Sequence, residues 1–296
     1  MNSVIMARSG TNRRQGSIWP RLQQILYDAL WYIIVVALAL VVMLPFIWMI
    51  VTSLKGQTEV FAYPPTWIPQ QFHWQNYLEV WRQAPFARYF LNSTIVALAV
   101  TIGQLTSCIL AAFAFARMNF KGKNTMFLVF LSTTMISTQV TLVPSYLIMK
   151  TFDWIDHYPA LIVPFLANAF GVFMIRQSFR TIPRELEEAA KLDGCGRFRF
   201  LVQILLPLCK PILASQALFA FMGNWNSYLW PLVVTNRDEM RTLQIGLRYF
   251  VSGEGGTQWG VYMAAALLVS LPVIFIYFFV QKSFVESMAS TGLKDI

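Results

Sequence analysis

Charged side chains are scarce in this sequence. Asp, Glu, Lys and Arg make up only 12% of the 296 residues, whereas an ordinary soluble domain carries about 25%. Hydrophobic residues make up 56%, and Phe, Trp and Tyr alone account for 15%. This composition excludes an ordinary soluble globular protein and indicates an integral membrane protein.

Cysteine and histidine are also rare. The three cysteines, Cys108, Cys195 and Cys209, are odd in number and scattered, which favours neither a disulfide framework nor a metal site. The two histidines, His73 and His157, stand alone and have no neighbour that suggests a metal site or a catalytic dyad. We therefore expect no catalytic residue and no metal ligand in this chain.

A phosphate-binding loop is missing as well. Such a loop needs a glycine five positions before a Gly-Lys pair, and Ser or Thr directly after the pair. The nearest candidate is Gly122-Lys123, but Arg117 and Asn124 occupy the two required positions. The chain is therefore not expected to bind or hydrolyse ATP itself, or to bind any other cofactor.

Long apolar runs are what the sequence has in abundance. A membrane-spanning helix needs about 20 predominantly apolar residues, and six segments meet this requirement. We predict an all-α membrane protein with a transmembrane domain over residues 29–281. Its six transmembrane helices are expected at about 29–53, 91–116, 125–149, 159–179, 208–235 and 261–281.

The positions of Lys and Arg predict the orientation in the membrane, because loops rich in these residues stay in the cytoplasm. Most of the 23 Lys and Arg residues fall in the N-terminus, the 117–124 loop, the 176–210 loop and the C-terminal segment. Both termini are thus expected to be cytoplasmic, as a mobile tail over 1–28 and a second tail over 282–296. The net charge of +9 reflects this topology and does not indicate a nucleic-acid surface.

The most charged run of the chain, residues 185–194, lies on the predicted cytoplasmic side between the fourth and fifth spans. Pro183 suits the first turn of a helix, and Glu185, Glu187 and Glu188 follow where negative charge is favourable. Gly194 is placed to end this helix in a left-handed cap. We predict a short cytoplasmic helix over residues 183–194.

This helix is expected to have a small, flat face. Leu186, Ala189, Ala190 and Asp193 share one side by their spacing, with charged residues on another. Alanines allow a partner surface to approach closely, so we interpret this face as a docking surface. The alternative, a helix lying on the membrane surface, would call for bulky apolar residues at these positions.

The same region resembles a known motif. Glu188-Ala189-Ala190 is followed by Gly194 and, after nine intervening residues, by Ile204-Leu205-Leu206-Pro207. This run is similar to the "EAA" loop of the membrane subunits of bacterial binding-protein-dependent ABC importers. The resemblance implies that the 176–207 loop contains a coupling helix that sits in a cleft on the ATP-binding subunit. The implied coupling residues are Glu188, Ala189, Ala190, Asp193 and Gly194.

Other segments resemble one branch of that family. Pro64-Pro65-Thr66-Trp67, Asn224-Trp225-Asn226-Ser227 and Thr291-Gly292-Leu293-Lys294 are similar to the MalG-type permease of carbohydrate importers. The resemblance implies a multi-pass protein of the bacterial inner membrane that moves an oligosaccharide. The implied partners are a larger MalF-type permease, two ATP-binding subunits that hold ATP and Mg, and a periplasmic or lipid-anchored solute-binding protein.

The fifth span contains the strongest candidates for a substrate pathway. Asn224, Trp225, Asn226 and Tyr228 offer the amides and aromatic faces that a sugar site requires. The alternative is that these polar groups join helices to one another, as they often do in membrane bundles. Gly223 lies next to them, and this span is also the best candidate for a gating element.

Two other function classes fit the sequence less well. A secondary transporter would have ionisable residues inside its spans for ion coupling, and the span cores here have none. An intramembrane enzyme would need a Ser/His pair, paired Asp residues or a metal set at membrane depth. The preferred reading is half of an ATP-driven importer, with the secondary transporter as the alternative.

Overall fold

The computed structural model describes residues 18–251 and 256–292, and within them every regular element is a helix. The expected tails fall partly outside this range, at residues 1–17 and 293–296. Helix α1 (Ile18–Ser53) begins earlier than the span expected from residue 29, and α15 (Trp259–Gly292) continues past the expected end at residue 281.

The chain divides into two compact units, Met1–Met49 and Ile50–Ile296. The described part of the first unit is the larger share of α1, which has Pro45 inside it and apolar side chains that are exposed on all sides. A helix that is apolar all round is one that lies in a membrane or in a large core. All other elements belong to the second unit.

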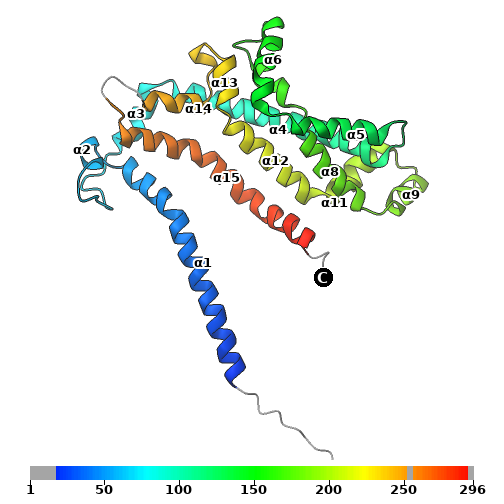
Figure 1. Cartoon of the computed structure of the whole chain (residues 1–296), viewed down its shortest axis with the longest axis horizontal. Coiled ribbons are helices and arrows are strands. Elements are labelled where there is room, and N and C mark those ends of the chain that lie inside the picture. The colour runs from blue at the N-terminus through cyan, green and yellow to red at the C-terminus, as the bar shows by residue number, and fades with distance from the viewer. Residues whose placement is uncertain (1–17, 252–255, 293–296) are drawn as a thin grey trace, which may run out of the picture. The chain divides into compact units, whose positions relative to one another are not determined.

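The core of the second unit is built around α4 (Phe86–Arg117) and α12 (Lys210–Trp225). Helix α4 packs against α8 (Ala169–Thr181) and α12, and α12 packs in turn against α15 (Figure 1). Small buried residues, among them Ala97, Ala112 and Ala264, allow the backbones of membrane helices to approach closely. The polar residues that these helices carry are thereby brought together.

Three described helical segments are long and apolar enough to cross a membrane: Leu26–Ser53, Phe86–Arg117 and Trp259–Phe279. Three further pairs of helices reach that length only when each bent pair is counted as one span. The six expected spans are therefore found only if each bent pair is counted as one span. The third, fourth and fifth spans are each a bent pair of helices and not one long helix.

The third span bends by 101° between α5 (Lys123–Ser132) and α6 (Thr138–Thr151). At the bend lies the 3₁₀ turn η1 (Thr133–Met135). The hydroxyls of Ser132, Thr133 and Thr134 each donate to the carbonyl three residues earlier, at 2.7–2.8 Å. Such bonds compete with the helical hydrogen bonds and bend the helix.

The fourth and fifth spans are broken where proline and amide residues lie. The fourth bends by 42° between α7 (Tyr158–Ile162) with the 3₁₀ turn η2 (Val163–Phe165) and α8. The chain turns by 85° near Cys209, where α12 begins, and α12 then ends at Trp225. Proline removes a helical hydrogen bond and clashes with the preceding turn, which accounts for breaks at Pro164 and at Pro207–Pro211.

Several segments expected as loops contain short helices. Asn76, at the start of α3, donates from Nδ2 to the carbonyls of Ser53 and Lys55 at 2.8 and 2.9 Å and so fixes α3 to the end of α1. The remaining elements are α2 (Gln57–Val60), α3 (Gln75–Gln83), α9 (Glu185–Leu192), α10 (Arg197–Phe200), the π-helix η3 (Leu201–Leu205), α11 (Leu206–Leu208), α13 (Leu229–Val234), η4 (Asp238–Met240), α14 (Leu243–Gly246) and η5 (Leu247–Phe250).

Candidate functional site

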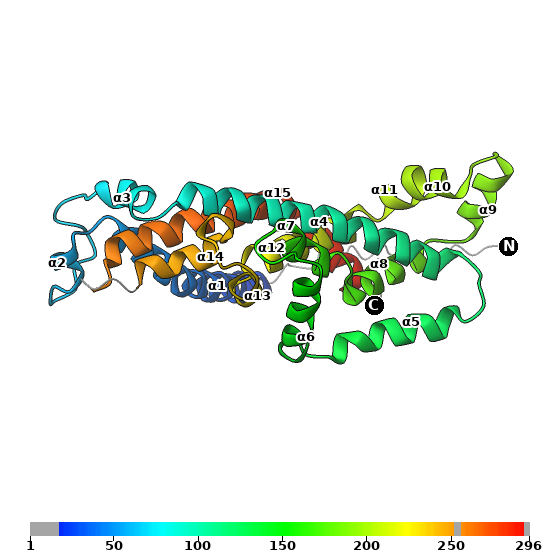
Figure 2. The same cartoon turned by 90° about the horizontal axis from the view of Figure 1, so that it is seen from above.

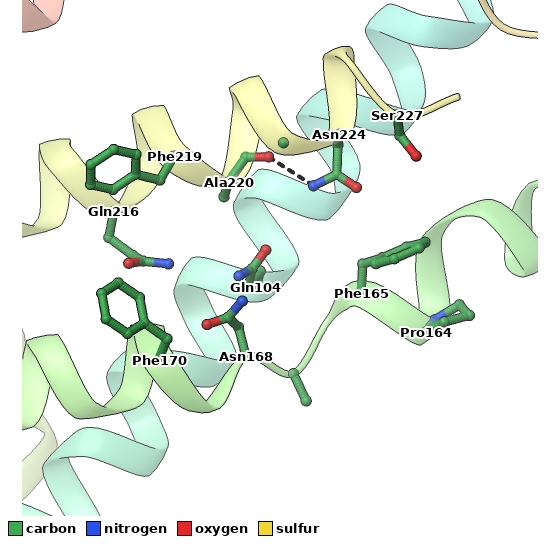
Figure 3. Close-up of a pocket in the computed structure, with 12 residues that line it drawn as sticks. Gln104, Pro164, Phe165, Asn168, Phe170, Gln216, Phe219, Ala220, Asn224 and Ser227 are labelled. Atoms are coloured by element: carbon green, nitrogen blue, oxygen red, sulfur yellow. Dashed lines mark hydrogen bonds between the residues drawn. The ribbon is translucent and has the colours of Figure 1, made fainter. Parts of the chain in front are cut away.

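A cavity of about 290 Å³ lies where α4, α12 and the start of α8 meet (Figure 3). Four amide side chains from three stretches of chain line it: Gln104 from α4, Asn168 before α8, and Gln216 and Asn224 from α12. An amide can both donate and accept hydrogen bonds. Such a set suits a hydroxyl-rich solute.

Local structure holds these amides in place. Asn168 is the N-cap of α8, and its Oδ1 accepts a hydrogen bond of 2.7 Å from the Gly171 backbone N–H. A Cβ at Gly171 would lie 2.6 Å from Nε2 of Gln216, so only glycine lets Gln216 approach this closely. Asn224 donates to the Ala220 carbonyl at 2.7 Å (Figure 3), which leaves its oxygen available to the cavity.

Three phenylalanines, Phe165, Phe170 and Phe219, also line the cavity, and no residue in its lining is ionisable. Aromatic faces stack on the apolar face of a sugar ring, and amides bond its hydroxyls. The cavity therefore offers contacts to an uncharged, hydroxylated group and has no cation to neutralise an anion.

Of the four pathway residues predicted from the sequence, only Asn224 lines this cavity. Trp225 is 1% exposed, and its Nε1 donates to the Val269 carbonyl at 3.0 Å. Its ring packs against Phe221 and Phe90, at centroid distances of 5.5 and 5.7 Å. The prediction that Trp225 offers a stacking face to substrate is therefore wrong, because this side chain joins α12 to α4 and α15.

Asn226 and Tyr228 also lie outside the cavity wall. Asn226 is the C-cap of α12, and its Oδ1 accepts a 3.4 Å hydrogen bond from Gln244. Tyr228 is the N-cap of α13 and is 39% exposed. Sequence reasoning missed Asn168, although an Asn directly before an apolar helical run is a recognisable helix start.

The short charged helix is present as α9, and Gly194 has the predicted left-handed conformation, with φ +74°. Its N–H donates to the Lys191 carbonyl at 3.0 Å, and the next N–H, that of Cys195, donates to the Ala190 carbonyl at 2.8 Å. This pair of bonds is a Schellman motif, which satisfies the last carbonyls of a helix.

The predicted flat face of α9 is only partly correct. Leu186, Ala189 and Asp193 are exposed, as is Glu188, but Ala190 is 6% exposed and packs in the core with residues of α4 and α8. Ala190 therefore anchors α9 to its own domain and cannot belong to an exposed docking face.

A buried arginine links α9 to the helices beneath it. The side chain of Arg117, at the end of α4, is 4% exposed and lies 3.7 Å from a carboxylate oxygen of Glu187. The same guanidinium donates to the carbonyls of Phe179 and Ile182 at 2.6 and 2.7 Å. Glu187 also pairs with the exposed Lys191 at 2.8 Å. Arg117 thus joins α4, the end of α8 and α9.

Comparison with known proteins identifies the family. Residues 105–290 match the family described as "Binding-protein-dependent transport system inner membrane component". The chain belongs to this family. It is 33% identical over 271 residues to the "sn-glycerol-3-phosphate transport system permease protein UgpE" of Yersinia enterocolitica, covering 89% of this chain and 96% of that protein. The same protein of Pectobacterium atrosepticum is 34% identical over the same shares.

Solved structures agree on the fold. A chain of a bacterial ABC transporter "involved in the import of the acidic polysaccharide alginate" superposes with a TM-score of 0.78 at 23% identity, over 90% of this chain and 98% of that chain. A chain of the alginate transporter in complex with its pentasaccharide-bound periplasmic protein gives a TM-score of 0.59 at 15% identity, over 89% and 93%.

These comparisons place the chain among the inner-membrane permease subunits of ABC importers. Subunits of this family are not themselves catalytic and work with separate ATPase subunits. A solute-binding protein is part of such systems. The resemblance stated from the sequence to a MalG-type permease agrees with this family.

Proposed function

We propose that this chain forms half of the pathway of an ATP-driven importer that carries a carbohydrate of the oligosaccharide class. The observation that supports this is the cavity of four amides and three phenylalanines with no ionisable lining residue. The transport systems of the relatives are named for glycerol 3-phosphate and alginate, both of which carry hydroxyl groups. In the present chain, the cavity would bind the hydroxylated, uncharged portion of such a solute.

The proposed topology follows the distribution of basic residues. Residues 29–281 form the transmembrane domain, and both termini lie in the cytoplasm, as does α9 between the fourth and fifth spans. Helix α9 acts as the coupling helix, with Glu188, Ala189, Asp193 and Gly194 toward an ATP-binding subunit. Ala190 holds α9 on its own domain.

The contacts of Arg117 support a route between ATP and the pathway. Movement of α9 is transmitted through Glu187 and Arg117 to the ends of α4 and α8. These same helices lead to Gln104 and Asn168 in the cavity wall. Coupling requires an element that two states of the transporter bias differently, and the α4–α8–α9 junction is that element.

The proposed complex contains one larger MalF-type permease, two ATP-binding subunits with ATP and Mg, and a periplasmic or lipid-anchored solute-binding protein. ATP binding closes the two ATPase subunits, and α9 follows its docking cleft. The bundle then changes from inward-facing to outward-facing and receives the solute from the binding protein.

The test is a mild-detergent pull-down of the tagged chain from its native membrane. Wild type is compared with Gly194→Asp, which places a side chain at φ +74°, where residues other than glycine are strained. The matched control is Gly196→Asp, since Gly196 has φ −69° and open space around its Cβ position. Both variants add the same charge to the same loop.

Wild type and the control are expected to retain an ATPase and a second permease, and Gly194→Asp to lose the ATPase alone. Equal retention by all three proteins would reject α9 as the coupling helix. Recovery of the chain alone, with sugar uptake in ATP-free vesicles, would overturn the importer proposal in favour of a secondary transporter.

A further inference from the structure

A second cavity, of about 630 Å³, lies at the other end of α8 and is lined by basic residues. Lys123 at the start of α5, Arg176 and Arg180 on α8, and Arg184 before α9 all contribute to its wall, and no acidic residue does. Both views of the fold place the start of α5 and α9 at the same end of the second unit (Figure 1, Figure 2). The transport proposal does not use this cavity.

In the part of the chain that the structure describes, none of these four cations has an acidic partner. Within residues 18–251 and 256–292, the ion pairs of the second unit involve Arg82, Arg117, Lys191 and Arg241 instead. Four like charges around one cavity repel one another, and this arrangement is unfavourable unless an anion neutralises them.

Arg176 is the most buried member of the set. It is 8% exposed, its Nε donates to the Phe115 carbonyl at 3.2 Å, and its guanidinium carbon lies 3.9 Å from the centre of the Phe127 ring. Its terminal nitrogens have no hydrogen-bond acceptor in the described part of the chain, and Arg176 lines the cavity. An oxygen of a ligand in the cavity could accept hydrogen bonds from these terminal nitrogens.

The start of α5 adds a second kind of anion contact. Gly122, Lys123, Asn124 and Thr125 line an adjoining hollow. Helix α5 has no acidic residue in its first turn and no side-chain cap on its first amides. Free amides and the helix dipole make such an end favourable for phosphate.

The apolar part of the same wall distinguishes between possible ligands. Phe115, Phe127 and Leu128 line the cavity beside the cations. Leu128 is 62% exposed and continues into an apolar outer face of α5 that includes Val129, at 63%. A ligand with a phosphate next to hydrocarbon matches both parts of the wall, whereas free phosphate would contact only the basic part.

We propose that this cavity, defined by Lys123, Arg176, Arg180 and Arg184, binds a phosphate-bearing ligand, namely the headgroup of an anionic phospholipid. Basic pockets between membrane helices on the cytoplasmic side are suited to such headgroups. The cytoplasmic position rests on the proposed function, because it follows from the proposed topology. Arg184 directly precedes α9, so the bound lipid would also fix the α8–α9 connection.

The test measures binding to the full-length chain, purified with the subunits it retains. Dioctanoyl phosphatidylglycerol is titrated, and bound lipid is counted by native mass spectrometry. Dioctanoyl phosphatidylcholine serves as the zwitterionic comparison, and inorganic phosphate as the lipid-free anion. The pocket variant is Arg180→Gln/Arg184→Gln, in which both arginines are exposed and unpaired with acids. Arg197→Gln/Arg199→Gln removes the same charge from exposed positions of the same loop and is the matched control.

Wild type is expected to bind phosphatidylglycerol at least about tenfold more tightly than phosphatidylcholine. At roughly fivefold per basic residue, the pocket variant, which lacks two of them, should bind about 25-fold more weakly than wild type. The control should stay within about twofold. Inhibition of lipid binding by millimolar phosphate would support recognition through the phosphate group.

Equal loss in the pocket variant and the control, or equal binding of the two lipids, would overturn the proposal. If inorganic phosphate bound as tightly as phosphatidylglycerol, the ligand would be a free anion and the lipid assignment would be wrong. Binding is measured without nucleotide or solute, so this result is independent of the pull-down that tests the transport proposal.

Discussion

The amide cavity and the basic cavity differ sharply in chemistry, although the same two helices help to build both. Helix α4 supplies Gln104 to the first and Ala116 to the second, and α8 runs from Phe170 in the first to Arg180 in the second. At 1.5 Å per residue, the two ends of this α8 segment are about 15 Å apart. One end has no ionisable residue in its lining, and the other has four cations without a paired acid.

The comparison shows that one pair of helices can build two cavities of different chemistry. Uncharged amides allow a solute to bind and leave again, because single hydrogen bonds contribute only about 1 kcal/mol each. Cations, in contrast, favour the tight binding of an anionic ligand. Arg117 lies next to the basic cavity and is buried, but Glu187 neutralises its charge. The four cations that line the cavity have no acidic partner among the described residues.

The largest effect is expected from a substitution beside the basic cavity, at the junction of α4, α8 and α9. Arg117→Ala removes two hydrogen bonds to carbonyls of the α8–α9 connection and leaves Glu187 without its buried partner. Loss of one partner of a buried pair costs about 3–5 kcal/mol, so the complex should show a clearly lower melting temperature and lose its ATPase in the pull-down.

Lys191→Ala is the matched control, because Lys191 pairs with the same carboxylate but is 56% exposed. An exposed pair of this kind contributes less than about 1 kcal/mol. The melting temperature of this variant should stay close to that of wild type. A similar loss in both variants would show that the buried ion pair is not what joins α9 to α4.

The second prediction tests the amide cavity without touching the basic one. Gly223 lines the cavity, and its Cβ position has open space around it. Gly223→Phe should fill much of the 290 Å³ cavity and lower solute uptake at least about tenfold. The pull-down should be unchanged, because α9 and its contacts are not altered.

Gly223→Ala is the control for the loss of glycine itself. Alanine favours a helix by up to about 1 kcal/mol over glycine and fills little of the cavity, so uptake should remain near the wild-type rate. Normal uptake by Gly223→Phe would mean that the solute does not pass through this cavity.

The smallest effect is expected outside both cavities, in the loop that follows α6 and the loop that follows α13. The carboxylate of Asp156 accepts hydrogen bonds from the backbone N–H groups of Asn236 and Arg237. Burial acts to raise the pKa of Asp156, but these bonds outweigh it and hold the pKa below its ordinary value. The ionised form is therefore the one that the fold stabilises.

A lowered pKa in the folded state gives stability that is complete above the ordinary value of about 4 and is lost as the pH falls through the folded value. Wild type should therefore lose a few degrees of melting temperature more than Asp156→Ala between pH 7 and pH 3. Both cavities should keep their binding at pH 7 in this variant. Parallel pH profiles of the two proteins would contradict this account.

Residues close together in the chain were the ones whose structure could be predicted. The helix at α9 and the left-handed Gly194 followed from Pro183, the glutamates and the glycine, because capping depends on a few adjacent backbone groups. The side of α9 that is buried could not be predicted. Ala190 faces the core because it belongs to one buried cluster with Phe113 and Ala116, which lie on α4 and are distant in sequence.

The candidate site shows the same limit. Asn224 was identified because polar residues in an apolar span are unusual, and Trp225 was added because an aromatic face can stack on a sugar. Nothing in the local pattern reveals that Val269, 44 residues away, accepts the hydrogen bond of Trp225. Asn168 lines the cavity because it is the N-cap of α8, and α8 packs against α12.

By itself, the sequence determined the membrane class, the helical content, the position of α9 and the lack of a phosphate loop. These properties depend on composition and on groups a few residues apart. Only the tertiary structure decided which amides share a cavity and which cations are left without acids. Those arrangements depend on how α4, α8 and α12 pack, and packing joins residues more than 100 positions apart, such as Gln104 and Gln216.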